Sequence, residues 1–201
     1  MSNPVNDRLI VRLSIWIFVA AVVSGSVLAQ TAASTPAREE STGARAEPTD
    51  PFQQISFLRG TWEAKTVNNP AVNASGTYTF RAELNGHILA RHSTSNSSAC
   101  KGPADFDCEH GDLLYIYADA PGQPLHAIYF DNEGHVIHYT VTAPTATTAE
   151  FLSDPAQPGP QFRLFYELNN AVMSGKFQMR MPGQQDWRSY LAWTGSKKQV
   201  N

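Results

Sequence analysis

The feature that most constrains the fold is a two-residue alternation of apolar and polar side chains that recurs along residues 58–194. Residues 76–84 (GTYTFRAEL) place Tyr78 and Phe80 on one face and Thr77 and Thr79 on the other. This period is typical of a β-strand with one buried face, because successive side chains point to opposite sides. The same pattern occurs in segments 58–66, 87–94, 112–118, 124–131, 135–142, 148–153, 161–168, 171–181 and 187–194. The sequence therefore predicts an all-β domain of about ten strands.

Turn residues separate these segments and predict hairpins between consecutive strands. Asn85-Gly86 favours a type I′ turn, and Asn169-Asn170 lies at a second hairpin position. A meander of this length leaves two unpaired edges unless it closes, so we predict an up-and-down antiparallel β-barrel. A two-sheet sandwich is the alternative. Its crossings need long connections, and only residues 95–111 are clearly long enough.

The N-terminus has the form of an export signal. Within residues 1–29, Arg8 and Arg12 precede the apolar run 15–23, and Val27-Leu28-Ala29 resembles a cleavage site. An uncut membrane anchor is the alternative, but the apolar run is shorter than the ~20 residues that cross a bilayer. We therefore expect a periplasmic or extracellular protein with no membrane association beyond this signal.

The rest of the chain divides into a linker and one domain. Residues 30–50 contain almost no large apolar side chains, so they are predicted to be a disordered linker. Residues 51–201 are predicted to form the barrel. The formal net charge is -3 and no basic stripe is present, so we expect no nucleic-acid partner. The oligomeric state is not indicated.

The chain contains two cysteines, Cys100 and Cys108, on either side of a loop with Gly and Pro. In an exported protein such a pair predicts a disulfide. Two metal-binding thiols are the alternative, but a second pair with ligand spacing is absent from the sequence. The nearby segment 105–112 is rich in carboxylates that could hold calcium, yet its spacing fits no EF-hand. We therefore assign no metal site.

The opening of the domain, Phe57-Leu58-x-Gly60-x-Trp62, resembles the signature of the calycins, the lipocalin and fatty-acid-binding superfamily. It is most similar to small bacterial barrels of unassigned function related to the haem-binding nitrobindins, over residues 55–195. The resemblance implies that Gly60 bends the first strand. It also implies that Trp62 plugs the closed end beside a basic residue from a late strand, for which Arg188 of the Trp187-Arg188 pair is the candidate. The last strands lack a histidine to ligate haem, so we expect no cofactor.

Pairing of neighbouring strands predicts which side chains point into the interior. A two-residue Asn132-Glu133 turn would place His126 opposite Tyr139, with both side chains inward. Such a pair could orient a polar group of a ligand. The predicted ligand-binding residues are Tyr78, Phe80, His126, Phe130, Tyr139, Phe162, Tyr166, Phe177 and Leu191.

These features predict an exported barrel that binds a small apolar molecule among its inward side chains. Catalytic triads, paired catalytic carboxylates and phosphate loops are absent from the sequence, so we assign no catalytic residue. Two alternatives remain. One is a wholly filled barrel that acts as an interaction module of the cell envelope, and the other is a small enzyme of the isomerase or cyclase type.

Overall fold

The computed structural model of the protein describes residues 50–68, 71–104, 106–154 and 159–199, which form ten strands and three short 3-10 helices. The strands are β1 (Gly60–Thr66), β2 (Ser75–Glu83), β3 (Ile88–Ser95), β4 (Gly111–Ala118), β5 (Leu125–Asp131), β6 (Val136–Thr145), β7 (Thr148–Ser153), β8 (Gln161–Asn169), β9 (Val172–Arg180) and β10 (Arg188–Lys197). The helices are η1 (Gln53–Leu58), η2 (Leu84–Gly86) and η3 (Ser97–Ala99). The predicted signal segment and all of the predicted linker except Asp50 lie outside the described residues.

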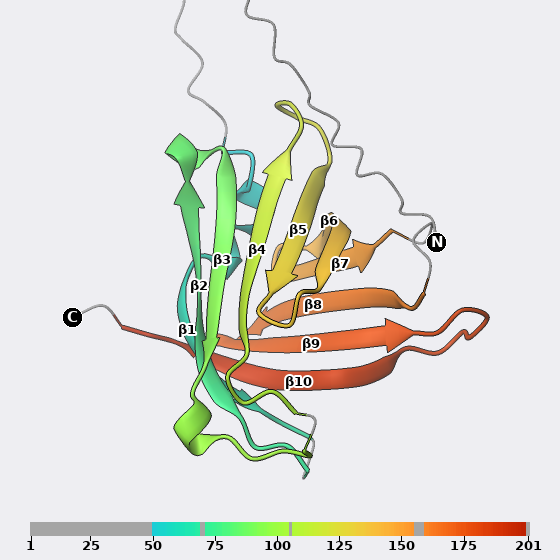
Figure 1. The fold of residues 1–201 in the computed structure, drawn as a ribbon. Coiled ribbons are helices and arrows are strands. Elements are labelled where there is room, and N and C mark those ends of the chain that lie inside the picture. The colour runs from blue at the N-terminus through green and yellow to red at the C-terminus, as the bar shows by residue number, and fades with distance from the viewer. Residues whose placement is uncertain (1–49, 69–70, 105, 155–158, 200–201) are drawn as a thin grey trace, which may run out of the picture. The chain divides into compact units, whose positions relative to one another are not determined.

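Each strand pairs antiparallel with the next strand in the sequence, and β1 also pairs with β10, so the sheet closes into a barrel (Figure 1). The closing pair runs from Trp62 opposite Lys197 to Thr66 opposite Trp193. Closure satisfies the backbone groups that an open meander would expose at its edges. The predicted ten-stranded up-and-down barrel is therefore confirmed, and the sandwich alternative is wrong.

The alternation that predicted the strands also divides the side chains between the interior and the surface. On β4, Leu114 and Ile116 are fully buried, whereas Tyr115 and Tyr117 are partly exposed on the outer face. The remaining strands contribute a continuous apolar core to one half of the interior. Its members include Phe80, Leu89, Leu125, Val141, Ala149, Phe151, Tyr166 and Met173.

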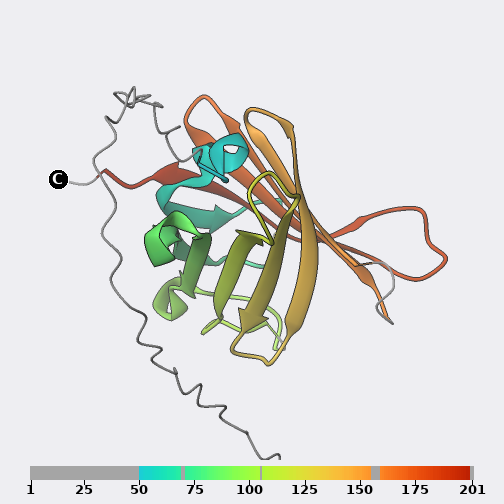
Figure 2. The ribbon, with the colours of Figure 1, turned by 90° about the horizontal axis from the view of Figure 1, so that it is seen from above.

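One end of the barrel is covered by η1 and Trp62; η1 is the cyan helix in Figure 2. Ile55 and Leu58 of η1 are fully buried in the core. The Trp62 side chain is also buried, and its indole N–H donates to the Leu58 carbonyl at 2.9 Å. This end of the interior is therefore packed solid, and any open space must lie toward the opposite end.

The start of β1 has a backbone that favours glycine. Gly60 has a φ of +114°, and a Cβ built there would lie 2.6 Å from the Lys197 side chain. The Lys197 ammonium lies 5.5 Å from the centre of the Trp62 ring. The expectation that Arg188 packs beside Trp62 is wrong, because β10 runs antiparallel to β1 and Arg188 is exposed at the other end of β10.

The connection between β5 and β6 contains three residues, not the two that were expected. Asp131 is joined to His135 by a backbone hydrogen bond of 3.3 Å, and Gly134 takes the positive φ of +90° that closes the turn. The Asp131 carboxylate accepts from the backbone N–H groups of Glu133 and His135, which stabilises the longer loop. His126 therefore pairs with Thr140, and Tyr139 pairs with Ala127.

This shift of one residue turns the side chains of β5 over relative to those of β6. Tyr139 points inward as expected, but Ala127 and Tyr129 point inward from β5 in place of His126 and Phe130. The predicted inward position of His126 and Phe130 is therefore wrong. His126 packs on the outer face against Tyr117.

Candidate ligand-binding cavity

The half of the barrel away from η1 contains a cavity of about 490 Å³. Inward side chains of β1 to β6 and β8 to β10 line it, together with residues of the loop before β4. Its lining residues include Tyr78, Arg91, His110, Asp112, Tyr129, Ile137, Tyr139, Phe162, Leu164, Phe177, Met179, Leu191 and Trp193. The volume lies in the range of sites that hold small organic molecules.

A buried ion pair lies at the inner end of the cavity. The Arg91 guanidinium on β3 donates to the Asp112 carboxylate on β4 and to the Tyr166 hydroxyl on β8. Burial alone would raise the pKa of Asp112, but the adjacent Arg91 charge lowers it below its usual value. Burial likewise opposes the charge on Arg91, and Asp112 more than offsets this effect. Both groups are therefore charged, and their charges cancel.

Three more tyrosines surround this ion pair. Burial raises the pKa of Tyr78, of Tyr129 and of Tyr139 above the usual value for a phenol. These side chains are therefore neutral near pH 7, and they act there as hydrogen-bonding groups. Tyr129 donates to the Asp131 carboxylate at 3.1 Å.

One wall of the cavity is apolar and aromatic. The rings of Phe162 and Phe177 stack with their centres 5.5 Å apart and their planes 9° from parallel. Ile137, Leu164 and Leu191 extend the same surface. An apolar ligand lying on this wall would remove aromatic and aliphatic surface from water, which is the main favourable term in binding such molecules.

Trp193 reaches the cavity because β9 has a glycine beneath it. A Cβ at Gly175 would lie 2.1 Å from the Trp193 indole, so no other residue fits at this position without displacing the ring. The indole also packs edge-on against Tyr166, with the ring centres 5.7 Å apart. Gly175 therefore fixes where the Trp193 side chain lies.

The rim of the cavity is acidic and carries two histidines. His110 Nε2 lies 3.5 Å from the Asp112 carboxylate and 3.2 Å from the Tyr129 hydroxyl. Its Nδ1 lies 3.9 Å from Asp107 and 3.9 Å from Glu133. The adjacent Asp112 raises the pKa of His110, against the opposing effect of partial burial.

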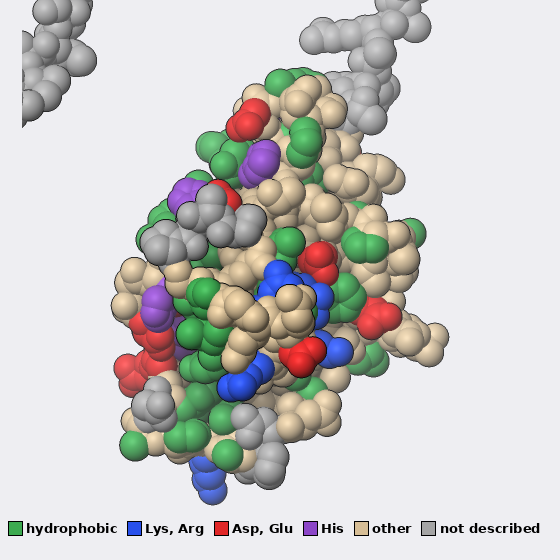
Figure 3. Space-filling view, turned by 90° about the vertical axis from the view of Figure 1, so that its right-hand side faces the viewer, with side chains coloured by type: hydrophobic (Ala, Val, Ile, Leu, Met, Phe, Trp, Pro, Cys, Tyr) green, Lys and Arg blue, Asp and Glu red, His purple; other side chains and the backbone are tan. Residues whose placement is uncertain are grey.

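The second histidine of the rim, His135, lies 2.9 Å from Asp131 and 3.5 Å from Glu133. Burial would raise the pKa of Asp131, but hydrogen bonds from the His135 backbone and side chain lower it overall. Two groups, Asp107–His110–Glu133 and Asp131–Glu133–His135, have ligand atoms close enough to hold a cation. In Figure 3, acidic and histidine side chains lie together at the left margin of the face shown, next to hydrophobic side chains.

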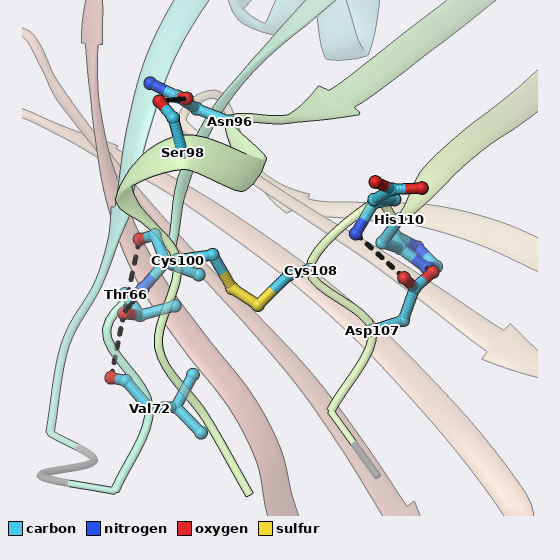
Figure 4. Close-up of a disulfide and its surroundings, with 10 residues drawn as sticks. Thr66, Val72, Asn96, Ser98, Cys100, Asp107, Cys108 and His110 are labelled. Atoms are coloured by element: carbon cyan, nitrogen blue, oxygen red, sulfur yellow. Dashed lines mark hydrogen bonds and ion pairs between the residues drawn. A yellow bond between two sulfur atoms is a disulfide. The ribbon is translucent and has the colours of Figure 1, made fainter. Parts of the chain in front are cut away.

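The disulfide between Cys100 and Cys108 restrains the loop that forms part of this rim (Figure 4). The loop contributes Phe106, Asp107 and His110 to the cavity. The predicted disulfide is therefore present, and it lies beside the mouth of the cavity.

The nine predicted ligand-binding residues fall into three groups. Tyr78, Tyr139, Phe162, Phe177 and Leu191 line the cavity. Phe80 and Tyr166 point inward but lie in the packed core. His126 and Phe130 lie on the outer surface, where Phe130 is 38% exposed.

Five further residues line the cavity without having been predicted from the sequence, namely Arg91, Asp112, Tyr129, His110 and Trp193. A signal for the first two was present, because Arg91 has the same parity as the buried Leu89 and Asp112 has that of Leu114. A charged residue on the apolar face of a predicted strand indicates a buried partner or a site.

No protein-family model matches the chain, and a search of curated proteins finds no significant match. Among the described residues, no helix is both long and apolar enough to span a membrane. The closed ten-stranded barrel is consistent with the resemblance to calycins. The fold and the cavity thus define the class of the protein, a closed antiparallel barrel with room for a ligand inside.

Proposed function

We propose that this protein is an exported barrel that binds a small, largely apolar molecule in its interior. The observation that carries the proposal is the cavity of about 490 Å³ with an aromatic wall, formed in a barrel whose other end is packed solid. A wholly filled interaction module would contain no such space. The cavity therefore favours the binding protein over that alternative.

The contacts would come mainly from the apolar wall. Phe162, Phe177 and Leu191 would cover the body of the ligand, and Tyr78 and Tyr139 would offer hydrogen bonds near the inner end. His126 and Phe130 are no longer part of the proposed site because they lie outside the barrel.

The disulfide and the N-terminal sequence support export. Disulfides persist in oxidising compartments, which agrees with the signal segment predicted for residues 1–29. An intact-mass measurement of the protein recovered from the periplasm or the medium would test this. A mass that lacks the first ~29 residues is expected, and the mass of the whole chain would mean a retained anchor.

A direct test of the proposed function is to titrate the purified protein with an apolar fluorescent dye and to extract co-purified molecules for mass spectrometry. Leu191→Trp adds bulk inside the cavity and is expected to weaken dye binding at least about tenfold. Phe130→Trp is the matched control, because Phe130 lies on the outer surface. Equal dye binding by both variants would place the dye outside the barrel and would count against the proposal.

The enzymatic alternative depends on His110. This histidine lines the cavity, its pKa is raised, and it contacts the neutral phenol of Tyr129. It could therefore transfer protons to a bound molecule. If the molecule extracted from the protein is turned over, His110→Gln should abolish the turnover while leaving the binding of the dye unchanged.

A further inference from the structure

Three residues that line the cavity carry buried polar side-chain atoms without a hydrogen-bond partner, and an entirely apolar ligand would leave these atoms unsatisfied. Within the described residues, four buried side-chain atoms lack a hydrogen-bond partner, and three of them belong to residues that line the cavity. These three are Arg91 Nε, the Tyr78 hydroxyl and Trp193 Nε1. Buried polar groups are nearly always paired, so this concentration at one place requires an explanation.

Two of the three atoms can only donate. Arg91 Nε and Trp193 Nε1 each carry a hydrogen and cannot accept one. Burial raises the pKa of Tyr78 overall, and the nearby Trp193 indole opposes this effect, but the two groups lack the geometry of a hydrogen bond. Even if the indole turned toward the Tyr78 oxygen, the phenol proton would still need an acceptor. The unpaired polar atoms at the inner end of the cavity are therefore mostly hydrogen-bond donors.

The electrostatics of the cavity argue against a charged head group. The charge of Arg91 is already neutralised by Asp112, so an anionic head group would be repelled by the buried Asp112 carboxylate without a free positive charge to bind. Asp131 and Glu133 at the rim add further negative charge. An ammonium group would be attracted to the rim, but it has no lone pair to accept from Arg91 or Trp193.

We infer that the ligand carries a neutral hydrogen-bond acceptor oxygen, as in a ketone, ester, ether or alcohol, and that this oxygen binds at the inner end of the cavity near Arg91, Tyr78 and Trp193. The inference rests on the proposed function, because it describes the polar end of the same ligand. The apolar body of the molecule lies on the wall formed by Phe162 and Phe177.

The test is to measure the affinities of four aromatic probes of nearly equal size for the full-length protein by calorimetry. They are methyl naphthyl ketone, ethylnaphthalene, naphthoate and naphthylmethylamine, which carry a neutral acceptor, no polar group, an anion and a cation. The ketone is expected to bind at least about tenfold more tightly than each of the other three, since a polar pocket discriminates against analogues that leave its groups unpaired.

Variants that remove single donors keep the charge balance of the cavity. Tyr78→Phe keeps the phenyl ring, whereas Trp193→Phe also replaces the larger indole by a phenyl ring. Each is expected to weaken ketone binding about two- to tenfold more than it weakens ethylnaphthalene binding. Tyr115→Phe is the control, because Tyr115 lies on the outer face of β4. A ketone preference that survives both cavity variants would overturn the assignment of these donors.

The remaining outcomes separate this inference from the proposed function. Equal affinity for the ketone and ethylnaphthalene would overturn the inference and leave the apolar binding protein intact. Tightest binding of naphthoate or of the amine would also overturn it, since the head group would then be charged. If neither the probes nor the apolar dye bind, both the proposed function and this inference fail.

Discussion

The guanidinium of Arg91 on β3 donates a hydrogen bond to the hydroxyl of Tyr166 on β8, which lies five strands away around the barrel. In a closed barrel of ten strands this contact joins opposite walls through the interior. The contact lies between the packed core at the η1 end of the barrel and the cavity at the opposite end, because Arg91 lines the cavity and Tyr166 belongs to the core. Arg91 therefore contributes both to the stability of the fold and to the cavity lining. The effect of substituting it depends on whether its partner Asp112 is substituted as well.

Substituting Arg91 alone should strongly lower the free energy of unfolding. Arg91→Met leaves the Asp112 carboxylate buried without its main counter-charge, and breaking a buried pair in this way costs about 3–5 kcal/mol of unfolding free energy. The double change Arg91→Met with Asp112→Leu should recover much of that loss, because no unpaired charge remains. Urea unfolding of the three proteins measures both quantities.

Arg81→Met is the control for this prediction. Arg81 is 63% exposed and pairs with Glu83 at 2.8 Å on the surface, so its loss should cost at most about 1 kcal/mol. If Arg91→Met costs no more than Arg81→Met, the buried pair does not contribute to stability as we argue.

His110 should make the stability depend on pH near neutrality. Its pKa is raised in the folded protein, chiefly by Asp112, above the ordinary value of 6.5. A raised pKa stabilises the fold fully below the unfolded value, and this contribution is lost as the pH rises through the folded value. The free energy of unfolding should therefore decline above about pH 6.5.

The carboxylates that face His110 are Asp107, Asp112, Asp131 and Glu133, and its other close polar neighbour is the Tyr129 phenol. The lowered pKa values of Asp112 and Asp131 keep these carboxylates ionised across this interval, and the raised pKa of Tyr129 keeps its phenol neutral. The charge that changes beside Asp112 is therefore that of His110. His110→Gln should flatten the decline in stability between about pH 6 and pH 8. Parallel curves for the wild type and the variant would show that the decline originates elsewhere.

Gly175 should be intolerant of even one added methyl group. A Cβ at this position would lie 2.1 Å from the Trp193 indole, so Gly175→Ala must displace that ring. Overpacking of this kind typically costs about 1–3 kcal/mol. The measurements are the midpoint of urea unfolding and the tryptophan emission spectrum, which should shift as Trp193 moves.

Gly111→Ala is the matched control for Gly175→Ala. Gly111 is also in a strand without a positive φ, and a Cβ there would have its nearest contact at 3.7 Å from the Ser93 carbonyl. It should change neither the emission nor the stability appreciably. A Gly175→Ala variant as stable as this control would mean that the Trp193 ring can move freely.

The fold was predictable from the sequence because its signals are local. The alternation of residues such as Tyr78 and Phe80 with threonines indicates which face of the strand is buried. Consecutive hairpins form a sheet with two unpaired edge strands, and these edges pair with each other when the sheet closes into a barrel. Even so, the Asn85-Gly86 turn is longer than a type I′ hairpin. Glu83 pairs with Ile88, and the intervening residues take up the extra length.

The site was less predictable because it depends on the exact register and on long-range contacts. A single extra loop residue, Gly134, moved His126 to the surface and brought Tyr129 inward. The Arg91–Tyr166 contact joins residues 75 positions apart, which no local pattern reports. Charged residues at inward positions, such as Arg91 and Asp112, are the one local sign that could have indicated the inner end of the cavity.

The disulfide should contribute both to stability and to the shape of the cavity mouth. It closes a loop with a sequence separation of 8, so replacing Cys100 and Cys108 by serine should lower the unfolding free energy by about 2 to 3 kcal/mol in the chain-entropy model. Because Phe106 and His110 of the rim lie near this bond, the loss should also weaken binding of the apolar dye. Guanidinium unfolding and dye titration of the double-serine variant measure the two effects, and the wild type treated with a reductant should match it. If stability falls while dye affinity stays the same, dye binding does not depend on Phe106 or its neighbours. The disulfide would then stabilise the loop without shaping the cavity.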